Sequence, residues 1–268
     1  MNAVFAVFGT IGKPIIGLTS QTARACLLLL ETLKWLIIGP FQKKFARRQF
    51  IVHQMVFAGV DSLVIAFFVA FFTGIVIAMQ TAPQLKDFGA TIFVASLVSV
   101  SICRELGPVF TALVVAGRVG SAIAAELGTM KVTEQVEALE TIALNPVRFL
   151  VVPRFIALVV MLPCLTIIAD LAGIGGGFLV GTLSLDLDAQ QYIDVAFKYL
   201  QMKDVMTGIL KSVAFAIAIS IVGCYKGLNT SGGAEGVGKS TTESVVISFI
   251  LIILFDCILT GIFYFTGV

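Results

Sequence analysis

Charged residues are scarce in this sequence. Asp, Glu, Lys and Arg together make up only 13% of the 268 residues, whereas 58% are hydrophobic. A chain with so little polar surface cannot cover its apolar side chains in a water-soluble globule, so it is expected to lie in a membrane. The formal net charge of +2 is too small to indicate a partner nucleic acid.

Paired cysteines and clustered metal ligands are also lacking. The five cysteines lie in or beside apolar segments, without the spacing of a disulfide framework or a zinc site. They are interpreted as small packing residues, and they are Cys26, Cys103, Cys164, Cys224 and Cys257. The first ten residues lack the basic region of a secretory signal. No metal site and no cofactor is therefore expected in this chain.

Long apolar runs dominate what is present. A helix needs about 20 apolar residues to cross the hydrocarbon core, and five stretches meet that length: 55–80, 92–125, 149–183, 205–225 and 244–266. These predict an all-α membrane protein. Lys and Arg concentrate before the first stretch, between the second and third, and between the fourth and fifth. Since cytoplasmic loops carry the excess of basic residues, we expect a cytoplasmic N-terminus and a periplasmic C-terminus.

Residues 1–50 differ from the rest. The apolar run Cys26–Ile38 is too short to span and contains Glu31 and Lys34. An interfacial helix on the cytoplasmic surface, followed by a basic connector, is the preferred prediction. A sixth span that uses tilt or a locally thinner bilayer is the alternative.

The second stretch has two notable features. About 34 helical residues would reach about 50 Å, and the stretch contains Gly107 and Pro108, so a broken or strongly tilted helix is expected. Small residues also recur at four-residue steps, which lets helices approach closely, either within the chain or between subunits. They are Ala112, Ala116, Gly120 and Ala124, then Gly117, Ser121 and Ala125, and in the third stretch Gly173, Gly177 and Gly181.

The segment Gly233–Ser240 matches the pattern of a nucleotide-binding P-loop. A P-loop requires a buried strand before it and a helix after it inside an α/β domain. Apolar helices are predicted on both sides of this segment, so we interpret it as a glycine-rich loop that does not bind nucleotide.

A polar segment, Glu126–Glu140, separates the second and third stretches. Thr133 is predicted to cap a short helix with Glu134 in its first turn. Val136, Leu139 and Ala143 would form one face, opposite Glu134 and Glu137. Such a helix suits docking to another protein, although an ordinary solvated loop helix has the same composition.

Five of the charged residues inside the apolar stretches are candidates for a functional or buried role, because each would cost ~2.5–3.5 kcal/mol near the bilayer centre. They are Arg104, Glu105, Arg118, Asp170 and Asp256. Arg104 and Glu105 either face a cavity that binds a zwitterionic or anionic headgroup, or anchor the outer end of the second span. Asp170 and Asp256 are expected to be protonated or buried between helices.

The run Arg104–Glu140 closely resembles the MlaE/YrbE permease family, and the Asn145-Pro146, Pro153-Arg154 and Ser231–Gly238 motifs also fit it. The similarity covers residues 50–268 and so implies a permease domain over 51–268. It implies a homodimeric, non-enzymatic transport subunit in the inner membrane that maintains outer-membrane lipid asymmetry by moving phospholipid between the two membranes. The implied partners are a cytoplasmic ABC ATPase of the MlaF type, which binds ATP and Mg²⁺, a periplasmic MCE-domain protein of the MlaD type and often a STAS-domain protein of the MlaB type.

The resemblance also assigns roles to residues. It makes the polar segment a coupling helix that receives motion from the ATPase, through Thr133, Glu134, Val136, Glu137, Leu139 and Glu140. It places Arg104 and Glu105 at the lipid cavity, with Met79, Gln80 and Asp256 as weaker candidates. Two other classes remain open from the residues alone. One is a stand-alone channel or ion-coupled carrier that uses Asp170 and Asp256 as proton sites, and the other is a membrane scaffold without transport.

Overall fold

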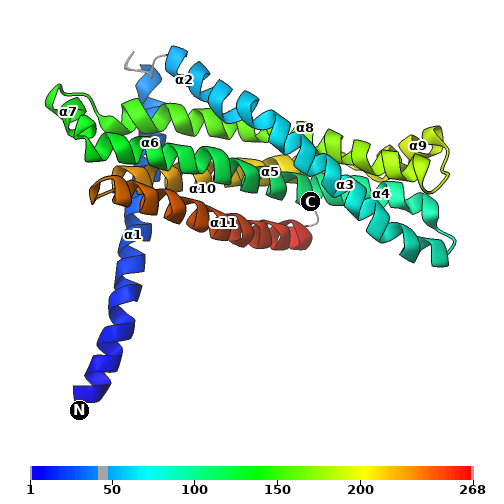
Figure 1. The fold of residues 1–268 in the computed structure, drawn as a ribbon, viewed down its shortest axis with the longest axis horizontal. Coiled ribbons are helices and arrows are strands. Elements are labelled where there is room, and N and C mark those ends of the chain that lie inside the picture. Colours follow the sequence, from blue (N-terminus) through cyan, green and yellow to red (C-terminus); the bar gives the residue numbers. More distant parts are fainter. Residues whose placement is uncertain (1, 42–47, 267–268) are drawn as a thin grey trace.

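The computed structural model describes the backbone of residues 2–41 and 48–266, and side chains from residue 19 to 38 and from 48 to 266. Every regular element in these ranges is helical. Five helical segments are long and apolar enough to cross a membrane, which confirms the predicted number of spans. They are Arg48–Asp87, Thr91–Val132, Val147–Leu183, Met202–Leu228 and Gly233–Thr266, and they run side by side in one elongated bundle (Figure 1).

Helix α1, Asn2–Phe41, is not one of these segments. It crosses the bundle near one end and does not run along it, as Figure 1 shows. Its described part keeps Leu27, Leu30 and Ile37 exposed. This arrangement supports the interfacial helix over a sixth span. Most of the basic connector lies outside the described residues.

The five spans are built from several helical segments. The first contains α2 (Arg48–Met55), the π-helical segment η1 (Val56–Val60) and α3 (Asp61–Asp87). The second contains the 3-10 turn η2 (Thr91–Phe93), α4 (Val94–Ser101), the π segment η3 (Ile102–Leu106), α5 (Gly107–Val115), the π segment η4 (Ala116–Gly120) and α6 (Ser121–Val132). The short helix α7 (Gln135–Thr141) follows.

The third span contains the π segment η5 (Val147–Val151) and α8 (Val152–Leu183). Helix α9 (Ala189–Tyr199) follows, then α10 (Met202–Leu228) and α11 (Gly233–Thr266) as the fourth and fifth spans.

The helix of the second span continues through Gly107 and Pro108, so the expected break is not found, whereas the alternative of a strong tilt stays a prediction. The π segment η3 ends at Leu106, and Pro108 occupies the first turn of α5. Proline lacks an N–H and its ring clashes with a carbonyl one turn earlier. The extra residue of a π turn widens that part of the helix, so the chain accommodates proline and continues.

Small residues mediate close packing within the chain. A Cβ added to Gly74 of α3 would lie 1.9 Å from the carbonyl oxygen of Gly173 on α8, so the two backbones are in contact. Ala112, Ala116 and Ala124 are fully buried. Gly117, by contrast, is exposed and has no neighbour within 4 Å of its missing Cβ. The first line of small residues is therefore intramolecular, while part of the second is left uncovered.

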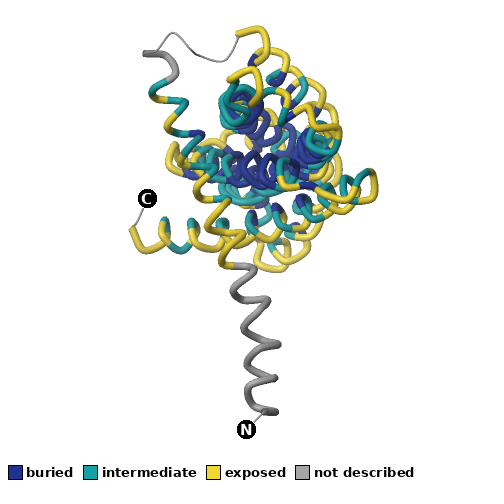
Figure 2. Tube along the Cα trace, turned by 90° about the vertical axis from the view of Figure 1, so that its left-hand side faces the viewer, coloured by how far each residue is buried: buried dark blue, intermediate teal, exposed yellow. Residues whose placement is uncertain are grey.

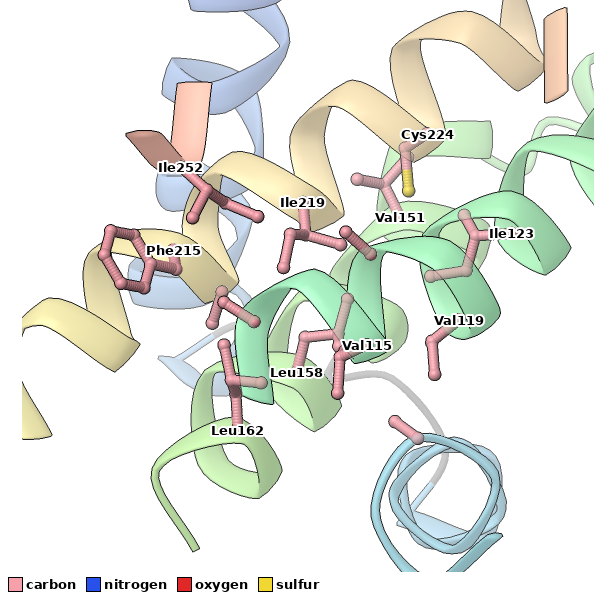
Figure 3. Close-up of a cluster of buried hydrophobic side chains, with 14 of the residues drawn as sticks. Val115, Val119, Ile123, Val151, Leu158, Leu162, Phe215, Ile219, Cys224 and Ile252 are labelled. Atoms are coloured by element: carbon pink, nitrogen blue, oxygen red, sulfur yellow. The ribbon is translucent and has the colours of Figure 1, made fainter. Parts of the chain in front are cut away.

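The main hydrophobic core lies where α5, α6, α8, α10 and α11 meet. Figure 3 shows Val115, Val119 and Ile123 of the second span against Leu158 and Leu162 of α8 and Phe215 and Ile219 of α10. Figure 2 shows this buried centre surrounded by exposed helix faces. Because these outer faces are apolar, they suit lipid as their solvent.

Helix α9 was not expected from the sequence. Asp188 caps it by accepting a hydrogen bond from the Gln191 N–H at 3.1 Å. Tyr192 is buried against Gly177 and Gly181, where any Cβ would meet its ring. Two of the glycines in the third span therefore make room for this aromatic side chain.

Candidate functional site

Lys211 is the centre of a charged cluster inside the bundle. It lies nine residues after the start of α10, about 13 Å along the helix, and its side chain is 1% exposed. Its Nζ lies 2.5 Å from Oε2 of Glu105 on η3 and 2.9 Å from Oδ1 of Asp256 on α11. It also donates to the Thr260 hydroxyl at 2.7 Å. One ammonium group thus holds the second, fourth and fifth spans together.

Arg104 lies beside this cluster and is bound more loosely. Its Nε is 3.7 Å from Oδ1 of Asp204, and 43% of its side chain is exposed. Asp204 is itself fixed at the start of α10, where it accepts a hydrogen bond from the Gln201 N–H at 3.1 Å. Arg104 is therefore the cation that a ligand can reach, whereas Lys211 is already saturated.

These groups border a pocket of about 160 Å³. Its lining is Arg104, Glu105, Thr207, Lys211, Thr260, Phe263 and Tyr264. Tyr264 is 79% exposed, so the rim next to the charged wall is open and aromatic. A cation, a carboxylate and an apolar rim in one pocket suit an amphipathic molecule with a charged head.

The structure brings together three of the five predicted lipid-contact residues. Arg104 and Glu105 line the pocket, and Asp256 contacts it through Lys211. Met79 and Gln80 are exposed on α3 and are not among the pocket-lining residues. Whether they touch lipid elsewhere stays a prediction.

Lys211 is the residue that sequence reasoning missed. Helix α10 also has Lys203 and Lys226 near its two ends, but Lys211 lies well inside its apolar run. That position was itself a signal, because an intramembrane charge is costly unless it is paired or functional.

Two further intramembrane charges lie away from the lining of this pocket. Arg118, on π segment η4, donates to the Phe57 carbonyl at 2.9 Å and to the Ser62 hydroxyl at 2.8 Å, and lies 3.5 Å from Asp61. It therefore joins the second span to the first. Asp170 is buried against Gly107, and its Oδ1 has no hydrogen-bond partner among the described residues.

The polar segment after the second span forms a short helix, but Thr133 does not cap it. Its hydroxyl donates back to the Thr129 carbonyl at 2.8 Å, and Glu134 occupies the cap position with a φ of 59° and no side-chain cap. Thr133 is the C-cap residue of α6 and lies one residue before the N-cap position of α7, so its hydroxyl faces α6 and not the first N–H groups of α7. Thr133 and Glu134 therefore belong to the turn between α6 and α7.

Within α7, Val136 is buried and Leu139 packs against the main core. Ala143 lies beyond the helix with a φ of 60° and is exposed, so it does not extend this apolar face. Glu137 is hydrogen-bonded by Lys131 of α6, and this bond lowers the pKa of Glu137. Glu134 and Glu140 remain exposed. Core packing and the Lys131–Glu137 bond therefore hold α7 against the bundle, while its exposed side is acidic.

The P-loop-like segment is helical throughout, because α11 begins at Gly233. Its backbone N–H groups after the first turn are committed to the helix and cannot wrap a phosphate chain. The prediction of a glycine-rich loop is therefore wrong, since Gly233–Ser240 is the start of a helix, but the structure supports the interpretation that the segment is not a nucleotide-binding loop.

The family model "Permease MlaE" matches residues 51–262. The chain belongs to the MlaE permease family. This permease is 37% identical over 260 residues to the intermembrane phospholipid transport system permease protein MlaE of Haemophilus influenzae, with 96% of this chain and 97% of that protein covered.

Two further relatives carry the broader name probable ABC transporter permease protein. One, from Rickettsia bellii, is 39% identical over 258 residues and covers 96% of the permease and 98% of its own length. The other, from Synechocystis, is 41% identical over 213 residues and covers 80% and 81% respectively. The permease is therefore an ABC transporter subunit, a transport protein and not an enzyme, and it works with a partner ATPase. This membership favours ATP-driven transport over the ion-coupled carrier.

Proposed function

We propose that this permease moves glycerophospholipid between the inner and outer membranes and so maintains outer-membrane lipid asymmetry. The observation that carries the proposal is the charged pocket at Arg104, Glu105 and Lys211, which lies inside the membrane-spanning bundle. Desolvated charge at such a depth is usually functional. The name of the Haemophilus influenzae relative, which describes intermembrane phospholipid transport, points to the same substrate class.

The pocket offers a matching group for each part of a phospholipid headgroup. Arg104 would contact the phosphate, because its guanidinium is exposed and only weakly paired. Glu105 is 34% exposed and would face an amine. Lys211 would not contact the lipid itself but would hold the Glu105 carboxylate in place. Phe263 and Tyr264 would meet the start of the acyl chains.

The assembly belongs to the proposal as well. The permease would sit in the inner membrane as a homodimer, with its N-terminus cytoplasmic and its C-terminus periplasmic. The uncovered small residue Gly117 supports a subunit contact on the second span. A cytoplasmic ABC ATPase would bind ATP and Mg²⁺ and dock at α7, an MCE-domain protein would bind on the periplasmic side, and a STAS-domain protein would complete some assemblies.

Lipid transfer by the purified complex tests the pocket assignment. Arg104→Ala should lower ATP-dependent transfer of phospholipid between donor and acceptor vesicles by about tenfold or more, the value of one charge-assisted contact. Arg104→Lys should recover part of it. Lys86→Ala, at an exposed lysine on the end of α3, is the matched control. Normal transfer by an assembled Arg104→Ala complex would rule out this role of Arg104.

Co-purification tests the docking surface separately. Glu134→Lys with Glu140→Lys reverses two exposed charges at α7, and should reduce the amount of ATPase that co-purifies. Asp194→Lys reverses an exposed acidic residue on α9, which lies at the opposite end of the bundle from α7 (Figure 1), and should not reduce the amount of ATPase that co-purifies. Equal recovery of ATPase from both variants would contradict docking at α7.

A further inference from the structure

A second polar pocket lies where α1 crosses the ends of α10 and α11. Its volume is about 400 Å³, and its lining comes from all three helices and from the turn that joins α10 to α11. It shares no lining residue with the pocket at Arg104. Its place beside an interfacial helix puts it at the depth of lipid headgroups and not at the centre of the bilayer.

The pocket is basic. Three cations line it, Arg24 from α1, Lys226 from α10 and Lys239 from α11, together with one carboxylate, Glu243. Glu243 pairs with Lys226, whose Nζ is 2.7 Å from its Oε2. Among the described residues, no carboxylate lies within ion-pair distance of Arg24 or Lys239. The pocket therefore has two cations available for an anion, with Ser240 as a further hydroxyl donor.

An apolar groove continues from this pocket. It measures about 230 Å³ and shares Arg24, Tyr225 and Asn229 with the polar pocket. The rest of its lining is Leu27, Leu28 and Leu228 with Glu31 at its edge. Glu31 accepts a hydrogen bond from the Asn145 amide at 3.1 Å, which ties its charge to the loop before the third span. The basic pocket is thus continuous with a groove lined by leucines.

The combination of a basic pocket and an apolar groove suits a lipid better than a soluble anion. A free phosphate or a nucleotide would use the cations and leave the leucine groove exposed. A phospholipid would place its phosphate between Arg24 and Lys239 and an acyl chain along Leu27, Leu28 and Leu228. Burying apolar surface next to a charge-assisted contact uses both halves of the site.

We infer that α1 and the adjoining ends of α10 and α11 form a binding site for an anionic glycerophospholipid of the adjacent leaflet, separate from the pocket at Arg104. Lys239 and Ser240 are the last two residues of the P-loop-like segment. They contact the phosphate through their side chains, because the backbone of that segment is helical. A bound lipid would join the interfacial helix to the fourth and fifth spans.

Lipid titration of the purified full-length chain in detergent tests this site, with native mass spectrometry as the readout. Phosphatidylglycerol and phosphatidylcholine of equal chain length are the probes. Wild type should prefer phosphatidylglycerol, and Arg24→Gln or Lys239→Gln should each reduce that preference by about tenfold. Lys86→Gln and Lys198→Gln, at exposed lysines outside both pockets, are the controls. An unchanged preference in both test variants would overturn the site.

Competition separates lipid from soluble phosphate. Leu27→Asn should weaken phosphatidylglycerol binding, and inorganic phosphate or ATP at the lipid concentration should not displace the lipid. If either competitor displaces it fully while Leu27→Asn has no effect, the lipid assignment is wrong. The test variants Arg24→Gln, Lys239→Gln and Leu27→Asn do not touch the pocket at Arg104, and the readout is binding and not transfer, so this test fails or succeeds independently of the transport proposal.

Discussion

Replacement of Lys211 by methionine should destabilise the bundle, because it leaves the carboxylates of Glu105 and Asp256 without a cation. Among the described residues, Lys211 is the only cation within ion-pair distance of Glu105 and of Asp256. Removing one partner of a buried ion pair costs about 3–5 kcal/mol, because the remaining charge stays unpaired. Glu105 and Asp256 keep 34% and 24% of their side chains exposed, so hydration of the two carboxylates reduces the cost of leaving them unpaired. We therefore expect a loss of about 3 kcal/mol in the free energy of unfolding.

Neutralising the two acids in the same protein should restore stability. A triple variant, Lys211→Met with Glu105→Gln and Asp256→Asn, leaves no charge to strand. Since a buried ionic cluster is often replaced by neutral groups at little cost, its stability should lie within about 1 kcal/mol of wild type. Lys198→Met on α9, an exposed site, controls for loss of a positive charge.

Buried thiols provide the assay. Cys103 and Cys224 are 2% and 0% exposed, so they react with a thiol reagent only when the bundle opens. With Cys26, Cys164 and Cys257 changed to serine, the reaction rate in mixed micelles of increasing denaturant strength gives the unfolding equilibrium. If the triple variant is as unstable as Lys211→Met, the effect comes from lost side-chain packing and the electrostatic argument is refuted.

Three further predictions rest on single contacts. The lowered pKa of Glu137 means that its bond with Lys131 stabilises the α6–α7 turn above the ordinary glutamate range near 4.5, and that this stabilisation is lost as the pH falls below it. Protection of the α7 amides from hydrogen exchange, relative to the intrinsic exchange rate at each pH, should therefore fall on acidification, and a Lys131→Gln variant with the same fall would contradict the assignment. Gly74→Ala should prevent close packing of α3 on α8 and lower the folded yield severely, whereas Gly117→Ala, which meets no neighbour, should fold as wild type; equal yields in a fluorescence size-exclusion assay would disprove the contact. Arg118→Leu should cost about 1–3 kcal/mol by leaving a backbone carbonyl of η1 without its donor, measured by the same thiol assay, and an unchanged midpoint would show that another group satisfies it.

Hydropathy predicted the spans because lipid imposes a simple rule. A backbone without water must close its hydrogen bonds inside a helix, and the required length is set by the bilayer. The sequence could not reveal which charges meet. Lys211 and Glu105 are separated by 106 residues, and their pairing depends on how α10 lies against η3. No local pattern contains that information.

Helix α9 escaped prediction for a different reason. Its 11 residues are mixed in polarity, and only Tyr192 and Ala196, four residues apart, are buried. A short amphipathic helix is stable only where a neighbour covers its apolar side, and here the neighbour is α4, whose Ser99 hydroxyl donates to the Ala196 carbonyl at 3.0 Å. Thr133 does not cap α7 because α6 extends to Val132 and makes Thr133 its own C-cap residue, which a local pattern of residues does not reveal.

The π segments η3 and η4 change the directions in which side chains of the second span point, compared with a regular α-helix of the same sequence. Arg104 and Arg118 are 14 residues apart, which on a regular α-helix places them about 40° from each other, on nearly the same face. In the structure they point to different helices, Arg104 to Asp204 on α10 and Arg118 to Asp61 on α3. Each π turn adds one residue to a helical turn and so changes the direction of everything beyond it. Deleting a residue from η3 would therefore turn Arg104 and Arg118 relative to each other while leaving the length of the span almost unchanged.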